Sequence, residues 1–147
     1  MAVSTAIAAI GTKLYLGTDV LSGTPSYNLI ANLHSISGPT TSRDRIDVTH
    51  QATTGGYREY IGGLADGGEV TFDISYLPTE STHNATTGLL SYLDSGAKTA
   101  IKVEWPDGVP TTWTFDATIS GFEATAAVDE QLKASVTLQI SGAPNFA

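Results

Sequence analysis

The sequence predicts a mainly β protein, an antiparallel β-sandwich or barrel with one short helix laid against it. Three observations support this fold class. Apolar and polar residues alternate with a period of two in several segments, which is typical of strands with one face in a core and the other in water. Thr, which suits a pleated surface, is the most frequent residue. A helical pattern occurs in a single segment.

Two strands are predicted near the start of the chain, at residues 13–17 and 27–37. The second segment carries apolar residues on both of its faces, with Leu29 and Leu33 on one and Ile30 on the other. A strand that is apolar on both faces is usually covered on both sides. We therefore expect residues 27–37 to occupy a central position or an interface.

Four later segments alternate clearly enough to assign their core-facing residues. These residues are Val70, Phe72, Ile74 and Tyr76; Ile101, Val103 and Trp105; Trp113, Phe115, Ala117 and Ile119; and Leu132, Ala134, Val136, Leu138 and Ile140. Residues 105–108, Trp-Pro-Asp-Gly, predict a hairpin turn between the second and third segments. Gly121 predicts a bulge as the third strand continues to Phe122. Residues 126–130 form the next turn, although they contain no glycine.

The predicted helix lies between residues 81 and 96. Residues 81–84 offer N-caps, and Leu89, Leu90 and Leu93 form an apolar stripe. Gly96 stands where a helix commonly ends. An internal glycine at position 88 costs about 1 kcal/mol relative to Ala, so the helix needs tertiary packing to persist.

The interval 38–68 is predicted to be a long loop with three Gly-Gly pairs. Structureless loops of this length are uncommon in compact domains and tend to be functional or disordered. Its apolar residues, among them Ile46, Tyr57 and Leu64, are costly to leave in water. Two interpretations follow: a segment that orders against a partner, or a loop folded onto its own domain.

Length and charge narrow the function classes. The 147 residues predict one domain spanning 1–147, with a flexible or strand-forming N-terminal arm at 1–12. No basic residue precedes Lys13 and no apolar run is long enough for a membrane helix, so neither a signal peptide nor a membrane partner is expected. The net charge of −8 argues against a nucleic-acid-binding surface, and the lack of Cys excludes thiolate chemistry.

No motif for catalysis, cofactor binding or metal binding is present, so we expect no enzyme activity, no cofactor and no metal. His34, His50 and His83 are far apart in the sequence, which favours surface or structural roles over a shared site. Glu69 and Asp73 share a strand face but lie about 13 Å apart along it, too far for a catalytic pair of carboxylates. We expect a solvated acidic stripe there instead.

The order of several short motifs resembles the tail tube (major tail) proteins of long, flexible-tailed bacteriophages. These motifs are Ile36-Ser37-Gly38-Pro39, Ile46-Asp47-Val48-Thr49, the run from Tyr60 to Val70, Trp105-Pro106-Asp107-Gly108, Trp113-Thr114-Phe115 and the closing run from Val136 to Gly142. Together they cover most of the chain from residue 27 to 142.

The resemblance implies a β-sandwich subunit that closes into hexameric rings, and rings that stack into a hollow tube similar to that of type VI secretion systems. It implies a structural virion protein, assembled in the host bacterial cytoplasm, whose tube conducts DNA during ejection. It also implies other tail proteins at the tube ends and a tape-measure protein inside.

The resemblance further implies that the loop at 38–68 and the chain ends make contacts between stacked rings. The expected contact residues in the loop are Ile46, Asp47, Tyr57, Tyr60, Ile61 and Leu64. We expect Asp47, Glu69 and Asp73 to face the lumen as an acidic stripe. Six copies would carry a formal charge of about −48, and an acidic lumen repels DNA phosphates, so DNA would pass without specific binding.

An alternative from the residues alone is a β-sandwich binding module, such as a virion decoration protein or a carbohydrate-binding domain. Trp105 and Trp113 flank one hairpin and offer a platform for stacking on a sugar, while their alternation favours packing in the sheet.

Overall fold

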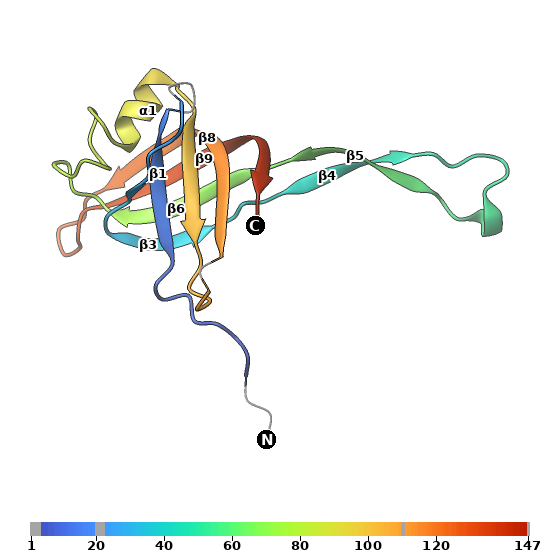
Figure 1. The fold of residues 1–147 in the computed structure, drawn as a ribbon, viewed down its shortest axis with the longest axis horizontal. Helices are drawn as coiled ribbons and strands as arrows, with labels where there is room; N and C mark the ends of the chain where they lie inside the picture. The colour runs from blue at the N-terminus through green and yellow to red at the C-terminus, as the bar shows by residue number, and fades with distance from the viewer. Residues whose placement is uncertain (1–3, 20–22, 110, 147) are drawn as a thin grey trace.

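A computed structural model describes residues 4–19, 23–109 and 111–146 of the protein. Seven antiparallel strands form one sheet that curls into a half-barrel, and a two-stranded arm projects from it (Figure 1). The order in the sheet is β2-β1-β7-β8-β9-β6-β3. The bounds of its strands are Lys13–Asp19 (β1), Asn28–Leu29 (β2), Leu33–Ser37 (β3), Glu69–Ser75 (β6), Thr99–Glu104 (β7), Thr112–Thr125 (β8) and Lys133–Asn145 (β9). The predicted fold class is confirmed.

The core lies inside the curl and is built from the alternating positions that the sequence indicates. All of the assigned positions are buried or half-buried, and Val70, Ile101 and Leu138 are fully enclosed. Each fully buried side chain of this size contributes about 1.5–3 kcal/mol of hydrophobic stabilisation. The predicted bulge is also present, because the register between β8 and β9 shifts between Ile119 and Gly121.

The turn between β7 and β8 is confirmed as well. The backbone N–H of Trp105 donates to the carbonyl of Thr111 at 2.9 Å, and Gly108 takes a φ of +83°. Asp107 accepts hydrogen bonds from the backbone N–H and the hydroxyl of Thr111. These bonds lower the pKa of the Asp107 carboxyl, the side-chain bond more than the backbone bond.

For residues 27–37, one continuous strand in a central position is wrong, while the interface alternative stays a prediction. The chain breaks into two short strands at opposite edges of the sheet, β2 beside β1 and β3 beside β6. Between them, Ile30 is buried, and its backbone N–H donates to the carbonyl of Leu14 in β1. Asn32 takes a left-handed φ of 59°, and its backbone carbonyl accepts the N–H of Ser75 in β6. The apolar residues on both faces reflect this crossing between the two edges rather than a central strand.

The helix is shorter than predicted and begins later. Helix α1 spans Leu89–Ser95, with Gly88 as its N-cap and Gly96 ending it in the left-handed region. Asn84 caps the preceding turn instead, because its side-chain oxygen accepts the backbone N–H groups of three residues, Thr86, Thr87 and Gly88. Leu89 is buried and Leu93 packs against the core, while Leu90 is only half-buried.

Residues 38–68 form no structureless loop. They contain strands β4 (Ser42–Asp47) and β5 (Tyr60–Asp66), which pair antiparallel, and a 3-10 turn η2 (Thr54–Gly56) between them. A strand pattern is hard to recognise here because every residue of β4 is exposed, so no buried face imposes an alternation of apolar and polar residues. Within the expected N-terminal arm, residues 4–12 form no helix or strand, and residues 1–3 lie outside the described residues.

His83 joins two segments of the half-barrel. Its imidazole is fully buried, accepts the backbone N–H of Leu77 through Nδ1 at 3.2 Å, and donates through Nε2 to the carbonyl of Ala31 at 3.0 Å. Both ring nitrogens are therefore used. The ring fixes the crossing segment between β2 and β3 to the loop that follows β6.

Replacing His83 with Leu should lower the free energy of unfolding by about 1–3 kcal/mol, because a part-buried backbone N–H and a part-buried carbonyl would lose their partners. Urea denaturation of the unassembled protein measures this change. Replacement of the exposed His50 with Leu is the control and should cost less than about 0.5 kcal/mol. Equal effects of the two substitutions would contradict a structural role for the buried imidazole.

Candidate assembly surfaces

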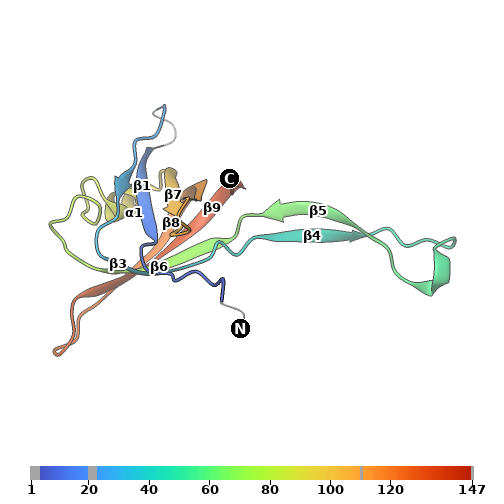
Figure 2. The same cartoon turned by 60° about the horizontal axis from the view of Figure 1, so that its bottom comes forward.

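The arm formed by β4 and β5, together with the turn that joins them, extends far from the half-barrel in both views (Figures 1 and 2). No core lies beneath it, since all of β4 and all of β5 except the half-buried Gly63 are exposed. A two-stranded hairpin in water is only marginally stable. The arm is therefore a surface whose burial would add stability.

The arm continues the β3–β6 pair in the same register. Ser37 lies opposite Thr71 in the sheet, and five residues further on, Ser42 lies opposite Asp66 in the arm. The segment 33–75 is thus one long hairpin, whose base belongs to the half-barrel and whose distal half projects beyond it. The direction of the arm follows from this continuity.

Glycines build the root of the arm. Gly68 takes a φ of +75°, and a Cβ there would overlap the carbonyl oxygen of Thr40, while a Cβ on Gly67 would overlap Ile140 of β9. The carbonyl of Gly68 accepts from the backbone N–H of Ile140 and from Nε2 of Gln139, both at 3.0 Å. These contacts hold the arm against β9 and exclude side chains at both glycines.

The pairing gives the arm two different faces. Ile46 and Ile61 are paired, so they share one face, and Val48 follows two residues later on the same side. All three are exposed, with Ile61 at 54%. We call these three residues the apolar face.

The opposite face carries every arginine of the chain, Arg43, Arg45 and Arg58, together with Tyr60 and Asp47. Arg45 lies over the Tyr60 ring at 4.7 Å, a cation–π contact, and Nη1 of Arg43 donates to the carbonyl of Gly63 at 2.9 Å. We call this set the basic face. The sequence analysis missed it, although the clustering of all arginines within 38–68 was visible in the sequence.

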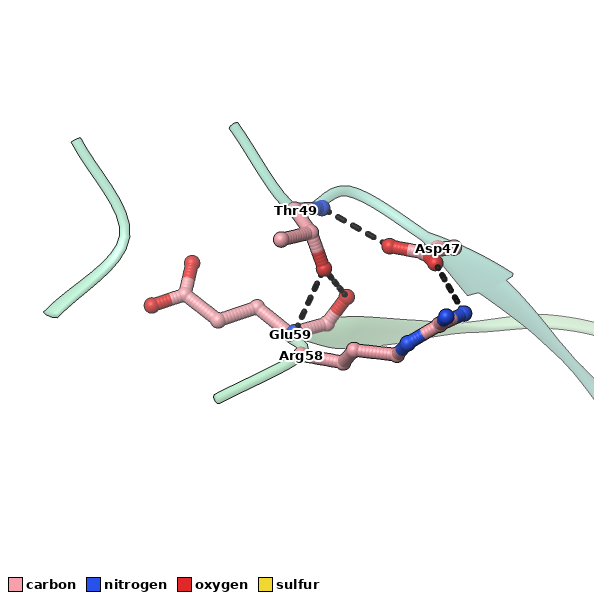
Figure 3. Close-up of polar contacts among 4 residues, drawn as sticks. All are labelled: Asp47, Thr49, Arg58 and Glu59. Atoms are coloured by element: carbon pink, nitrogen blue, oxygen red, sulfur yellow. Dashed lines mark hydrogen bonds and ion pairs between the residues drawn. The ribbon is translucent and has the colours of Figure 1, made fainter. Parts of the chain in front are cut away.

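Near the tip, polar contacts hold the two strands together (Figure 3). Thr49 donates its backbone N–H to Asp47 at 2.9 Å and accepts the backbone N–H of Glu59 through its hydroxyl at 2.9 Å. Arg58 forms an ion pair with Asp47 at 3.6 Å. Hydrogen bonding from Thr49, by its side chain first and its backbone second, lowers the pKa of the Asp47 carboxyl.

The structure separates the residues of the expected acidic stripe. Glu69 and Asp73 lie on the exposed face of β6, where Asp73 accepts from the hydroxyl of Ser35 at 3.1 Å. Asp47 ends β4 in the projecting arm and is not part of that face. The expected loop contacts, in contrast, all lie in the arm: Ile46, Asp47, Tyr60, Ile61 and Leu64 on its strands, and Tyr57 in the connecting turn.

The other candidate sites do not come together. His34 contacts Ser75 and Gln131, His50 lies in the arm, and His83 is the buried ring described above. Within the described residues, no group of three His, Asp or Glu side chains could hold a metal ion. No helix in the described part of the chain is long and apolar enough to span a membrane.

The two tryptophans pack edge to face, with ring centroids 5.0 Å apart and an interplanar angle of 74°. Trp113 makes a similar contact with Phe146 near the C-terminus. Two rings at this angle do not form a flat platform for a sugar. They anchor the end of the chain against the β7–β8 hairpin instead.

Comparison with known proteins identifies the family. The family model described as lambda phage tail tube protein matches residues 17–147. The chain belongs to this family. It is therefore a structural tail tube protein of the virion tail, not an enzyme, and a tube of such subunits requires self-association.

Solved structures share the fold. One is the tail of an empty gene transfer agent particle, determined by helical refinement with C6 symmetry, which is 18% identical with a TM-score of 0.68 over 91% of this chain and 95% of that chain. The virion of a native gene transfer agent particle gives 17% identity and a TM-score of 0.67 over the same shares. The SPP1 tail tube gives 14% identity and a TM-score of 0.64 over 92% of this chain and 77% of that chain. No curated protein matches the chain in sequence.

Replacing Gly68 with Ala should disrupt the root of the arm. The left-handed φ alone costs roughly 1–2 kcal/mol for a residue with a Cβ, and the overlap with Thr40 adds to it. Hydrogen exchange of the β4 and β5 amides measures the loosening of the arm. The matched control is Gly56→Ala, which also has a positive φ but open space around it and should leave exchange at the root unchanged. Unchanged exchange at the root in both variants would contradict a fixed root.

Proposed function

We propose that this tail tube protein closes into six-membered rings that stack into a hollow tube, and that the arm makes the contact between successive rings. The observation that carries the proposal is the arm itself, an exposed hairpin without a core that projects from one end of the molecule (Figure 2). The C6 symmetry reported for the gene transfer agent tail supports six subunits per ring.

The apolar face of the arm supplies a reason for stacking. Ile46, Val48 and Ile61 expose apolar surface in the single chain, and burial contributes about 25 cal/mol per Å². Packing this face against another copy also stabilises the hairpin, because an isolated two-stranded hairpin is only marginally stable. A head-to-tail contact along one axis repeats without closing, so it generates a filament.

Ring closure requires a second contact, between neighbouring subunits of the same ring, in addition to the contact of the arm with the next ring. The half-barrel leaves two edge strands, the two-residue β2 and the five-residue β3, at the ends of its strand order. Unpaired strand edges are templates for pairing with another chain. We infer that neighbouring subunits meet at these edges in the ring, which removes the exposed edges of the sheet.

The lumen is proposed to be lined by the polar face of β6 and the adjoining residues of β9. Glu69 and Asp73 are exposed there, and Thr71 lies opposite Thr137, so the face is acidic and hydroxyl-rich. Negative charge repels DNA phosphates, and DNA would pass without specific binding. Asp47 is not included because it lies in the arm. A tape-measure protein inside the tube and other tail proteins at its ends complete the proposed partners.

Replacing Ile61 with Asp should block tube formation while the half-barrel stays folded, because Ile61 lies on the apolar face and contacts no part of the core. Negative-stain microscopy and sedimentation of the concentrated protein measure tube formation, and circular dichroism measures folding.

The control is Ile61→Val, which keeps an apolar side chain and should assemble as the unchanged protein does. Tubes formed normally by Ile61→Asp would remove the arm from the ring-to-ring contact. A wild-type chain that forms neither rings nor tubes would contradict the proposed function as a whole.

A further inference from the structure

The molecule has two chemically different ends. The arm projects at one end of the long axis, and the turn between β8 and β9 and the loop that follows β6 both lie toward the other end (Figures 1 and 2). A hydrogen bond from the backbone N–H of Tyr76 to the carbonyl of Leu132 ties that loop to the start of β9. We call the exposed or half-buried residues there the acidic end: Leu77, Glu80, Val128, Asp129 and Glu130.

The charge of the chain is divided unevenly between the arm and the rest. Residues 42–66 hold all 3 arginines and 4 acidic residues, a net charge of −1. The remainder holds 4 lysines against 11 acidic residues, a net charge of −7. Within the arm the charges are also separated, because Asp44 and Glu59 lie on the side of the apolar face while the arginines lie on the other. The basic face, with Asp47 as its only acid, therefore has a local excess of positive charge.

The carboxylates of the acidic end have no basic partner of their own. Among the described residues the only ion pair joins Arg58 to Asp47, so Glu80, Asp129 and Glu130 are free of ion pairs within that part of the chain. Apolar surface accompanies these charges, since Val128 is fully exposed and Leu77 is 45% exposed. An exposed valine beside unpaired carboxylates matches an arm that offers isoleucines on one face and arginines on the other.

We propose that the acidic end of one copy receives the arm of a copy in the next ring, with its carboxylates facing the basic face. This inference rests on the proposed function and names the docking surface that the function leaves open. A head-to-tail repeat along the long axis brings these two ends together without any rearrangement of the half-barrel. The exposed pair of Arg58 with Asp47 at 3.6 Å does not oppose the contact, because surface ion pairs of this kind contribute little and can exchange partners.

Charge complementarity of this type fixes register and partner choice more than it adds affinity. Like charges placed opposite each other are unfavourable, so the basic face should not dock on a surface that carries basic side chains. The contact should also weaken with salt, because exposed charges are screened beyond about 8–10 Å at physiological ionic strength.

The test is a charge-reversal exchange within the full chain. The arm variant carries Arg43→Glu and Arg45→Glu, the turn variant carries Asp129→Arg and Glu130→Arg, and the combined variant carries all four. Each double variant should raise the protein concentration needed for tube formation at least about tenfold at low salt, and the combined variant should return to within about threefold of the unchanged protein. Sedimentation and negative-stain microscopy give the concentrations, and circular dichroism confirms folding.

A control matched to the turn variant makes the same change in net charge elsewhere, through Asp94→Arg in α1 and Asp116→Arg in β8. It should assemble within about threefold of the unchanged protein. Normal assembly by the turn variant, failure of the combined variant to recover while folded, or an equal defect in the control would each overturn the acidic end as the docking surface. The unchanged chain is assayed in parallel. If it forms tubes while any of these three results is obtained, the proposed function stands and only this inference fails.

Discussion

The structure depends on one constraint. The half-barrel buries a single face of its sheet, and one hairpin is much longer than the strands of that sheet. The segment 33–75 begins in β3 and finishes in the neighbouring strand β6. The residues between these two strands extend past the edge of the sheet and form the arm. Because the register is the same on both sides of the root, the departing strands stay paired. Backbone hydrogen bonds are therefore satisfied in the arm although no core supports it.

The root converts that pairing into a fixed direction. Gly67 lies against Ile140 so closely that no side chain fits, and the carbonyl of Gly68 accepts two hydrogen bonds from β9. An arm held in this way loses less conformational entropy when it docks than a flexible loop would, and preorganised surfaces bind better for that reason. The Gly67-Gly68 pair, one of the three in the predicted loop, therefore acts as a close-packing site.

The sequence predicts those parts of the fold in which one face of a strand is buried. The alternation in β6 through β9 identifies the core residues, and Gly121 and Gly108 identify a bulge and a turn, because burial and backbone conformation leave local marks. Residues 27–37 mislead because a chain that crosses between two sheet edges is apolar on both sides without being central. The start of α1 misleads because Asn84 caps a turn with the same side-chain geometry that caps a helix.

The arm shows the limit of sequence interpretation most clearly. Its residues were expected to make contacts, which their exposure agrees with, but its strands were not recognised and Asp47 was expected beside Glu69 and Asp73. The strands and the position of Asp47 were missed for one physical reason. The β4–β5 pairing continues from the β3–β6 pair and then shifts register between Arg43 and Arg45, and no residue in 42–66 is buried to reveal it. The same lack of a buried face makes the arm informative once its pairing is known. No core within the chain explains why Ile46 and Ile61 lie on one side and the three arginines on the other. This division into two faces is typical of a surface that contacts another molecule.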